Sequence, residues 1–499
     1  MDGKAAAPVF LCLLALSQLA FAEASANQLA DFSSPLDATI KVEEKPLIES
    51  PQALYVSMEV ENSHNTPITL YIIRQKNNEW EFVRLIGAMA PSTKTPVELE
   101  VELRYDKQSE QKTKYAIVGR GEDGTVYGKY FEIKEDWSVY EANIRDSLSG
   151  SIVTWVPFIA VLTIILIFIT MRMAYNSKSE CSTPNEYTIK TLLFPEITGR
   201  PAEEKLADVI INPITMAFEA LCVAVLVIVM FDSVAKEAGF DDGLKIMVLS
   251  AIGSFVVPFL YFAAAWYFEK REESKPLRFF AGMFVWGMFA AFLSLIITST
   301  LLSGVKDASA ISFAVVTTML IAPVVEEVMK GIGVLLVSGH HDYNDTLTGL
   351  LLGFTCGVGF AFIENWFYFA FRTDPFQMGL GNWTMLILYR SFFNTLAHGF
   401  FVATVSTAIG YCKGIERILK YAKLAFIPGT FLAITIHMMY NLSALADSFV
   451  FANKSIPFFI FNPMLIILLA TLFFLVLVFA TIDEKRRKEA ANREIMVPK

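Results

Sequence analysis

The feature that most constrains this chain is a series of long apolar segments that begins after Gly150. The hydrocarbon core of a bilayer is about 30 Å thick, and a helix needs about 20 apolar residues to cross it. Nine stretches of that length lie near residues 152–172, 211–231, 246–268, 279–302, 311–337, 347–371, 384–411, 422–445 and 462–482. The pattern predicts a polytopic α-helical membrane protein with about nine transmembrane helices.

Composition narrows the class of protein further. Of the 499 residues, 54% are hydrophobic and 18% are charged, whereas soluble domains carry roughly 25% charged residues. This excludes an ordinary soluble enzyme and indicates a protein that contacts the lipid bilayer. Residues 23–150 hold 14 Lys and Arg against 22 Asp and Glu, which argues against nucleic acid as a partner. The five cysteines show no paired spacing, so neither a disulfide framework nor a cysteine zinc site is expected.

The first 22 residues have the pattern of a secretory signal peptide. Lys4 precedes an apolar core at 5–16, and Ala20-Phe21-Ala22 forms a small-x-small cleavage site. The apolar run is too short to span a bilayer. We expect residues 1–22 to be removed, and an uncleaved anchor is the alternative.

Residues 23–150 show a different period. Apolar and charged residues alternate strictly at 97–105, as in a strand with one buried face and one wet face. Similar runs, separated by turn-rich stretches, lie at 54–60, 68–73, 82–86, 115–118 and 126–133. The region predicts an all-β sandwich domain. It contains no recognisable catalytic motif.

The distribution of Lys and Arg predicts the orientation in the membrane. A cleaved signal peptide would place the β domain outside, and Lys and Arg would then concentrate in the alternate loops that face inward. Such residues fill four inward segments, at 172–205, 270–278, 413–423 and 485–488, whereas the inward loop at 338–346 has none. We expect an extracytoplasmic β domain, in the periplasm or a lumen, and a cytoplasmic C-terminus. The remaining regions are a first membrane helix with a cytoplasmic linker, a polytopic membrane domain and a basic cytoplasmic tail, at 151–210, 211–482 and 483–499.

Ionisable residues inside the apolar segments are candidates for function. A charge at the bilayer centre costs roughly 2.5 to 3.5 kcal/mol on insertion scales. Glu326 and Glu327 are adjacent in the fifth segment, where Glu326 and Lys330 share a helical face and Glu327 points about 100° away. Pro323 removes a backbone donor and predicts a kink just before the pair that could admit water. A buried ion pair alone would explain one carboxylate and not both.

The sixth segment combines a glycine seam with a carboxylate. Glycines at four-residue spacing let a neighbouring backbone approach closely. The same helical face continues to Glu364, which precedes Asn365; the glycines are Gly349, Gly353 and Gly357. A carboxylate at the end of a close-packed seam needs a partner, so Glu364 and Asn365 are candidates for the same site.

The seventh and eighth segments each place a histidine inside the membrane. A single buried histidine is more often a satisfied core residue, but two of them, each with an Asn on its own helical face, indicate a site near the Glu pair. The polar stripes consist of Arg390, Asn394 and His398 in the seventh segment and of His437 and Asn441 in the eighth.

These residue types permit two kinds of chemistry. A carboxylate in a low-dielectric pocket can act as a general base toward water, and a neighbouring His or Asn can stabilise a developing oxyanion. A Glu and two His can equally form a three-ligand zinc site, here Glu327, His398 and His437, with the other Glu as base. The expected cofactor is therefore none or zinc, and no His-Glu-x-x-His motif is present to decide between them.

The order of these motifs resembles that of the PrsW family of intramembrane proteases, which shares a superfamily with the CAAX prenyl endopeptidases. The similar stretches are 326–330 (EEVMK), 359–365 (GFAFIEN), 394–399 (NTLAHG) and 437–441 (HMMYN). The resemblance covers about residues 210–445 and would make the domain at 211–482 protease-like. It implies nothing about the signal peptide, the β domain or the first membrane helix.

The resemblance also implies roles for the candidate residues. Glu326 and Glu327 would supply the base and its partner, and His398 and His437 would activate water or hold the oxyanion. The motifs do not decide between a metal and a glutamate-only mechanism. The supporting residues would be Lys330, Glu364, Asn365, Asn394 and Asn441.

Two functions are consistent with the sequence. The leading hypothesis is an intramembrane endopeptidase that cuts membrane protein substrates within or near the bilayer. The alternative is a noncatalytic transporter or receptor-like scaffold that uses the same Glu, Lys and His residues as an ion or proton relay. A relay needs no adjacent Glu pair, and no inverted repeat is evident, which favours the protease.

Overall fold

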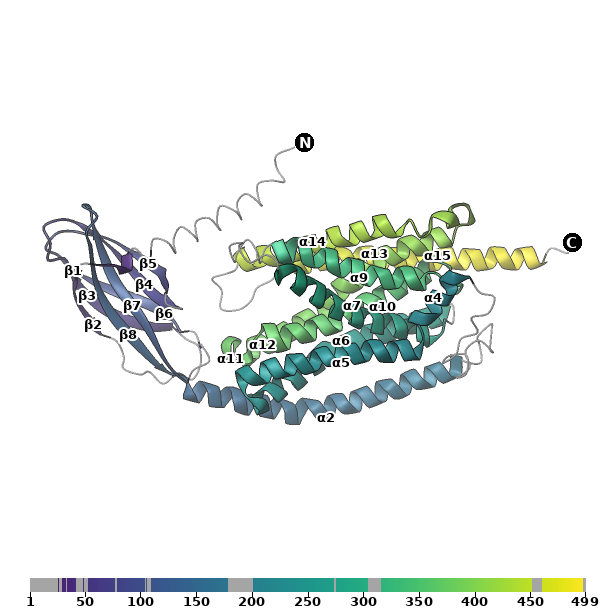
Figure 1. Cartoon of the computed structure of the whole chain (residues 1–499), viewed down its shortest axis with the longest axis horizontal. Coiled ribbons are helices and arrows are strands. Elements are labelled where there is room, and N and C mark those ends of the chain that lie inside the picture. Colours follow the sequence, from purple (N-terminus) through teal and green to yellow (C-terminus); the bar gives the residue numbers. More distant parts are fainter. Residues whose placement is uncertain are drawn as a thin grey trace, which may run out of the picture. The chain divides into compact units, whose positions relative to one another are not determined.

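The chain divides into two compact units in the computed structural model, Met1–Ser147 and Leu148–Lys499, called here the β unit and the helical unit (Figure 1). The predicted signal peptide at 1–22 lies outside the described residues. The structure describes Ala26, 29–32, 34–41, 48, 53–76, 79–103, 105, 109–177, 201–272, 275–303, 316–450 and 460–496.

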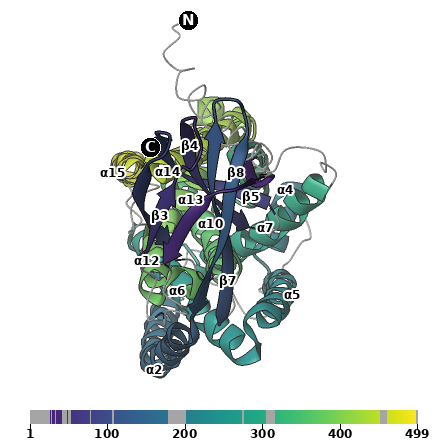
Figure 2. The same ribbon diagram turned by 90° about the vertical axis from the view of Figure 1, so that its left-hand side faces the viewer.

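The β unit contains two sheets. The larger has the strand order β1-β8-β7-β4-β5 and the smaller has the order β2-β3-β6. All pairings are antiparallel except that of β1 with β8, and the long strands β7 and β8 lie side by side (Figure 2). The strands are β1 (Ser34–Pro35), β2 (Asp37–Lys41), β3 (Ala53–Glu61), β4 (Ile68–Lys76), β5 (Glu79–Met89), β6 (Lys94–Glu102), β7 (Glu110–Gly121) and β8 (Val126–Asp136).

Alternation of apolar and polar residues explains the burial in the smaller sheet. Val56 of β3 lies opposite Leu99 of β6, and Met58 lies opposite Val97. These four side chains are at most 3% exposed, whereas the intervening Glu98 is exposed. Successive side chains of a strand point to opposite faces, so one face of each strand is apolar.

The predicted β-sheet region is confirmed. Five of the predicted runs lie within strands β3, β4, β5, β7 and β8, and the run at 97–105 overlaps β6, which ends at Glu102. The sequence analysis did not predict β1 and β2. They have two and five residues, which is too short for an alternating pattern to be recognised.

The described part of the helical unit consists mainly of long helices. Helix α2 (Ser138–Ser177) begins in the β unit and continues into the helical unit. The other elements are α4 (Ala202–Ile210), α5 (Pro213–Ala238), α6 (Phe240–Glu272), α7 (Leu277–Ser303), η1 (Thr317–Ile321), α9 (Ala322–Val337), α10 (Thr346–Phe367), η2 (Tyr368–Arg372), α11 (Pro375–Met378), α12 (Leu380–Tyr389), η3 (Arg390–Asn394), α13 (Thr395–Lys413), η4 (Glu416–Tyr421), α14 (Phe426–Val450) and α15 (Phe461–Met496).

Seven helical stretches among the described residues are long and apolar enough to cross a membrane. A multi-pass membrane protein is thus confirmed, although the predicted number of about nine is not. The predicted segment at 152–172 lies within α2 and is not one of the seven. The described part of the segment at 311–337 consists of the shorter elements η1 and α9. The seven are Pro213–Ala238, Phe240–Glu269, Leu277–Leu301, Thr346–Arg372, Leu380–Lys413, Phe426–Asp447 and Phe461–Arg487.

Helix α10 is the central helix of the unit. It packs against α13, α7 and α6 (Figure 1), and its membrane-length window is entirely buried. A Cβ atom on Gly357 would lie 2.0 Å from the carbonyl oxygen of His398 in α13, and one on Gly349 would lie 2.6 Å from that of Ser406. The close approach predicted from the glycine spacing therefore occurs, and the backbones of α10 and α13 are in close contact at His398.

The substitution Gly357→Ala should destabilise the helical unit, because α10 and α13 would have to separate to admit the methyl group. Overpacking of this kind costs about 1 to 3 kcal/mol, measurable as a lower unfolding midpoint of the detergent-purified protein. Gly381→Ala is the matched control, since a Cβ there meets no atom within 4 Å. Equal stability of the two variants would contradict the close packing of α10 and α13.

Candidate active site

The polar residues predicted from four membrane segments come together in the helical unit. Residues of α9, α10, η3, α13 and α14 contribute, and the ring centroids of His398 and His437 lie 5.2 Å apart. The convergence depends on α10, which holds α13 close on one side and also contacts α9. The predicted residues at this place are Glu326, Glu327, Lys330, Glu364, Asn365, Asn394, His398, His437 and Asn441.

Short π-helical turns precede two of the contributing helices. The turn η1 ends directly before α9, where Pro323 occupies the first helical turn. A π-helical turn thus precedes the proline at which the sequence predicts a kink. Asn441 of α14 donates from its Nδ2 to the carbonyl oxygen of Thr318 at 2.8 Å. Asn441 thus binds the backbone of η1 rather than the other candidate side chains.

Glu327 forms the centre of a fully buried charge network. Its Oε1 accepts from the Nζ of Lys330 at 2.6 Å and lies 2.8 Å from the Nδ1 of His437. The Nζ of Lys330 also lies 3.0 Å from the Nδ1 of His398 and 4.0 Å from the centroid of the Phe360 ring. Glu327 and Lys330 are 0% exposed, so each charge depends on these partners instead of water.

Lys330 lies on the face of Glu326, as the sequence analysis expected, but its closer contact is with Glu327. Its Nζ lies 3.8 Å from Glu326 and 2.6 Å from Glu327. Positions three and four residues apart are both neighbours on a helix. The contacts of Lys330 with His398 and of Glu327 with His437 favour the three-residue pairing, which spacing alone could not decide.

Glu326 is left facing a cavity. Its Oε2 atom is buried and has no hydrogen-bond partner among the described residues. The Nζ of Lys330 lies 3.8 Å away and the Nδ1 of His437 lies 3.9 Å away, both beyond hydrogen-bonding distance. A buried carboxylate oxygen without a partner is costly, so this atom is available to a water molecule, a metal ion or a substrate.

A second network surrounds Glu364 at the end of α10. One carboxylate oxygen accepts from Arg390 Nη2 at 2.8 Å, and the other lies 2.7 Å from His398 Nε2 and accepts from Asn394 Nδ2 at 3.2 Å. Asn365 Oδ1 accepts from Asn394 at 3.0 Å and from Arg390 at 3.2 Å. His398 bridges the two networks, because its Nδ1 faces Lys330 and its Nε2 faces Glu364.

The two networks border a cavity of about 640 Å³. Glu326, Glu364, His398, His437 and Asn441 line it together with other residues of α7, η1, η2, α12, η3 and α14. Glu327, Lys330 and Asn365 are not in this lining and lie behind it. The adjacent glutamates therefore differ in position: Glu326 lines the cavity, whereas Glu327 lies behind it and binds His437.

The sequence analysis missed Tyr440. Its hydroxyl donates to the Oδ1 of Asn394 at 3.0 Å, and the residue lines the same cavity. Its position three residues after His437 places both on one helical face. That spacing is the signal that could have identified it.

The comparisons with known proteins agree with this geometry. Residues 275–478 match the model of the PrsW family intramembrane metalloproteases. The resemblance drawn from the sequence motifs is thereby confirmed, and all nine candidate residues lie within the PrsW match. No curated protein and no solved structure matches the chain. The PrsW match supports an intramembrane protease over the residues that it covers.

The substitution Lys330→Ala should destabilise the helical unit strongly, because it leaves Glu327 charged and buried. Breaking a buried pair in this way costs about 3 to 5 kcal/mol, and the double variant Glu327→Leu/Lys330→Met should recover much of the loss. Lys236→Ala is the matched control, since Lys236 forms an exposed pair with Asp232 that contributes at most about 1 kcal/mol. Equal unfolding midpoints for Lys330→Ala and Lys236→Ala would refute the buried network.

Proposed function

We propose that this protein is an intramembrane endopeptidase that hydrolyses peptide bonds of membrane protein substrates inside the cavity of the helical unit. The observation that carries the proposal is that Glu326, His398 and His437 line the cavity together, each with a ligand atom within 4.8 Å of those of the other two. Hydrolysis requires a base for water and donors for the developing oxyanion, and these groups are of that kind. The PrsW match favours this function over a transporter or scaffold.

The donor set at the cavity fits a divalent metal ion. Glu326, His398 and His437 each offer a ligand atom, and these atoms all lie within 4.8 Å of one another. Glu326 is a better candidate ligand than Glu327, which the sequence analysis chose, because Glu327 already holds Lys330 and His437. A bound zinc ion would lower the pKa of its water and polarise the substrate carbonyl. His398 would have to exchange its contact with Lys330 or Glu364 to bind it.

The protein residues then have separate roles. Glu327 accepts only, so its bond to His437 places the proton on Nδ1 and leaves the Nε2 of that ring as the acceptor. In a site without metal, Glu326 would hold the water molecule and take its proton; with zinc bound, Glu326 would be a ligand and the ion would supply the activated water. Glu364 orients His398 through the Nε2 of that ring, and Arg390 and Asn394 hold Glu364 in place by hydrogen bonds. These positioning contacts act through the histidines and not on the substrate.

The substitution Glu326→Gln should abolish cleavage while the protein stays folded. The change removes the base and keeps the size of the side chain, so we expect the rate on a transmembrane peptide substrate to fall about 100-fold or more. Glu219→Gln is the matched control, because Glu219 is a buried glutamate of α5 outside the cavity lining. Its activity should equal that of the wild type. Full activity of Glu326→Gln would refute the proposed role.

Treatment with a strong chelator forms the second arm of the same assay. We expect cleavage to be lost on chelation and restored by zinc, since the three ligands fit a metal. Unaffected activity in the chelator would reject the metal and leave a glutamate-only mechanism, with Glu326 still required.

We also propose the membrane arrangement expected from the sequence. Residues 1–22 would be a cleaved signal, the two sheets at 23–150 an extracytoplasmic sandwich, and the C-terminal tail cytoplasmic, with nine helices crossing the bilayer. The Lys and Arg residues at 413–423 and 485–488 support this orientation. Acceptor sites for glycosylation inserted in the β unit and after Met496 test it: only the first should be modified, and modification of the second would reverse the assignment.

A further inference from the structure

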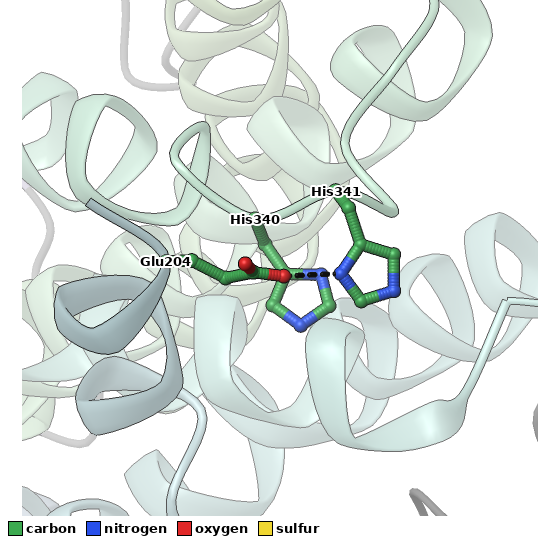
Figure 3. Close-up of side chains that lie close together, drawn as sticks. All are labelled: Glu204, His340 and His341. Carbon is green, nitrogen blue, oxygen red and sulfur yellow. Dashed lines mark hydrogen bonds and ion pairs between the residues drawn. The ribbon is translucent and has the colours of Figure 1, made fainter. Parts of the chain in front are cut away.

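A second group of side chains of the metal-binding kind lies outside the cavity. It consists of Glu204 of α4 and of His340 and His341 in the loop between α9 and α10 (Figure 3). One ligand atom of each lies within 4.8 Å of the others. Among the described residues, only this group and that of Glu326 meet the criterion of at least three such side chains.

The carboxylate of Glu204 points at the two imidazole rings. Its Oε1 lies 2.5 Å from the Nδ1 of His341, and the two rings stack with centroids 4.2 Å apart (Figure 3). A fourth side chain is close, because the carboxylate oxygens of Asp342 lie 3.7 Å from His340 Nδ1 and 3.7 Å from His341 Nε2. Two imidazoles and one or two carboxylates within this space form a donor set typical of zinc.

The Nδ1 of His340 carries no proton. It accepts from the backbone N–H of Asp342 at 3.1 Å, so its single lone pair is engaged and a metal ion would have to replace that hydrogen bond. The Nε2 of His340 is buried and has no hydrogen-bond partner among the described residues. That nitrogen lies 3.6 Å from the Oδ1 of Asp208. A carboxylate behind a ligating imidazole is the usual orienting partner in metal sites.

The loop is held in place without a ligand. Lys413 of α13 donates from its Nζ to the carbonyl oxygens of Ser338 and His340, at 2.5 and 3.1 Å. A Cβ atom on Gly339 would lie 2.5 Å from the carbonyl oxygen of Glu203. The absence of a side chain at Gly339 thus lets the first turn of α4 approach the histidines, which brings Glu204 to them.

We propose that Glu204, His340 and His341 bind a zinc ion, with Asp342 or a water molecule as fourth ligand. The bound ion would connect α4 to the loop that follows α9. The preference for zinc over calcium or magnesium follows from the imidazole nitrogens, which those harder ions bind poorly. His340 lies beyond the end of α9 at Val337, ~15 Å along the helix from Glu327. The site is therefore separate from the cavity, and the proposal does not depend on proteolysis.

Zinc content of the full chain tests the proposal. The protein is purified in detergent as the variant His398→Ala/His437→Ala, which removes two ligands of the cavity group, and is incubated with zinc and passed over a chelating resin. We expect it to retain about one zinc ion per chain. Adding Glu204→Gln and His341→Ala should remove that ion. Adding His64→Ala instead, which deletes a histidine of the β unit, should leave it in place.

His341→Ala alone protects the test against a loss of folding, because the His341 side chain is 47% exposed and its removal costs little packing. We expect its zinc affinity to fall at least about tenfold, together with loss of the visible absorption of bound Co²⁺. The proposal is overturned if the His398→Ala/His437→Ala protein holds no zinc, or if the ion persists without Glu204 and His341. In both cases the group is only a hydrogen-bonded histidine–carboxylate pair. If the cavity binds no metal, the wild type and the His398→Ala/His437→Ala variant retain the same number of zinc ions per chain.

Discussion

The buried ion pair between Glu327 and Lys330 is the interaction on which the rest of the site depends. Both charges lie at zero exposure within a helix whose only other charged residue is Glu326, and an unpaired charge there is costly. Further contacts come from His437, whose Nδ1 lies 2.8 Å from the Oε1 of Glu327, and from His398, whose Nδ1 lies 3.0 Å from the Nζ of Lys330. The requirement for these partners ties α9 to α13 and α14.

The two adjacent glutamates have different surroundings. The side chains of adjacent residues point about 100° apart on a helix, so Glu326 cannot share the partners of Glu327 at hydrogen-bonding distance. It faces the cavity with an oxygen that lacks a hydrogen-bond partner among the described residues. The ammonium group of Lys330 lies 3.8 Å from it. The buried network of Glu327, Lys330 and His437 thus lies directly behind the carboxylate that lines the cavity.

The sequence predicted the helices and the meeting of their polar residues better than it predicted the contacts. Apolar length identifies the membrane helices, and the spacing of Gly349, Gly353 and Gly357 correctly indicated a close helix contact. The closer contact of Lys330 with Glu327 was not predicted, because positions three and four residues away are equivalent until the neighbouring helices are placed. The π-helical turn η1 was foreseen only as a kink at Pro323, since its hydrogen bond to Asn441 joins residues far apart in the chain. For the same reason the sequence does not reveal that Glu204 reaches His341.

The central claim is that Glu326 and Glu327, although adjacent, lie in different environments. Labelling of Glu326→Cys and Glu327→Cys variants with a small charged thiol reagent in detergent tests it most directly, with each signal divided by that of the denatured protein. A thiol reacts only where the reagent can reach it. The account predicts rapid labelling at position 326, which lines the cavity, and protection at position 327, which is 0% exposed. Equal labelling, or faster labelling at 327, would contradict it.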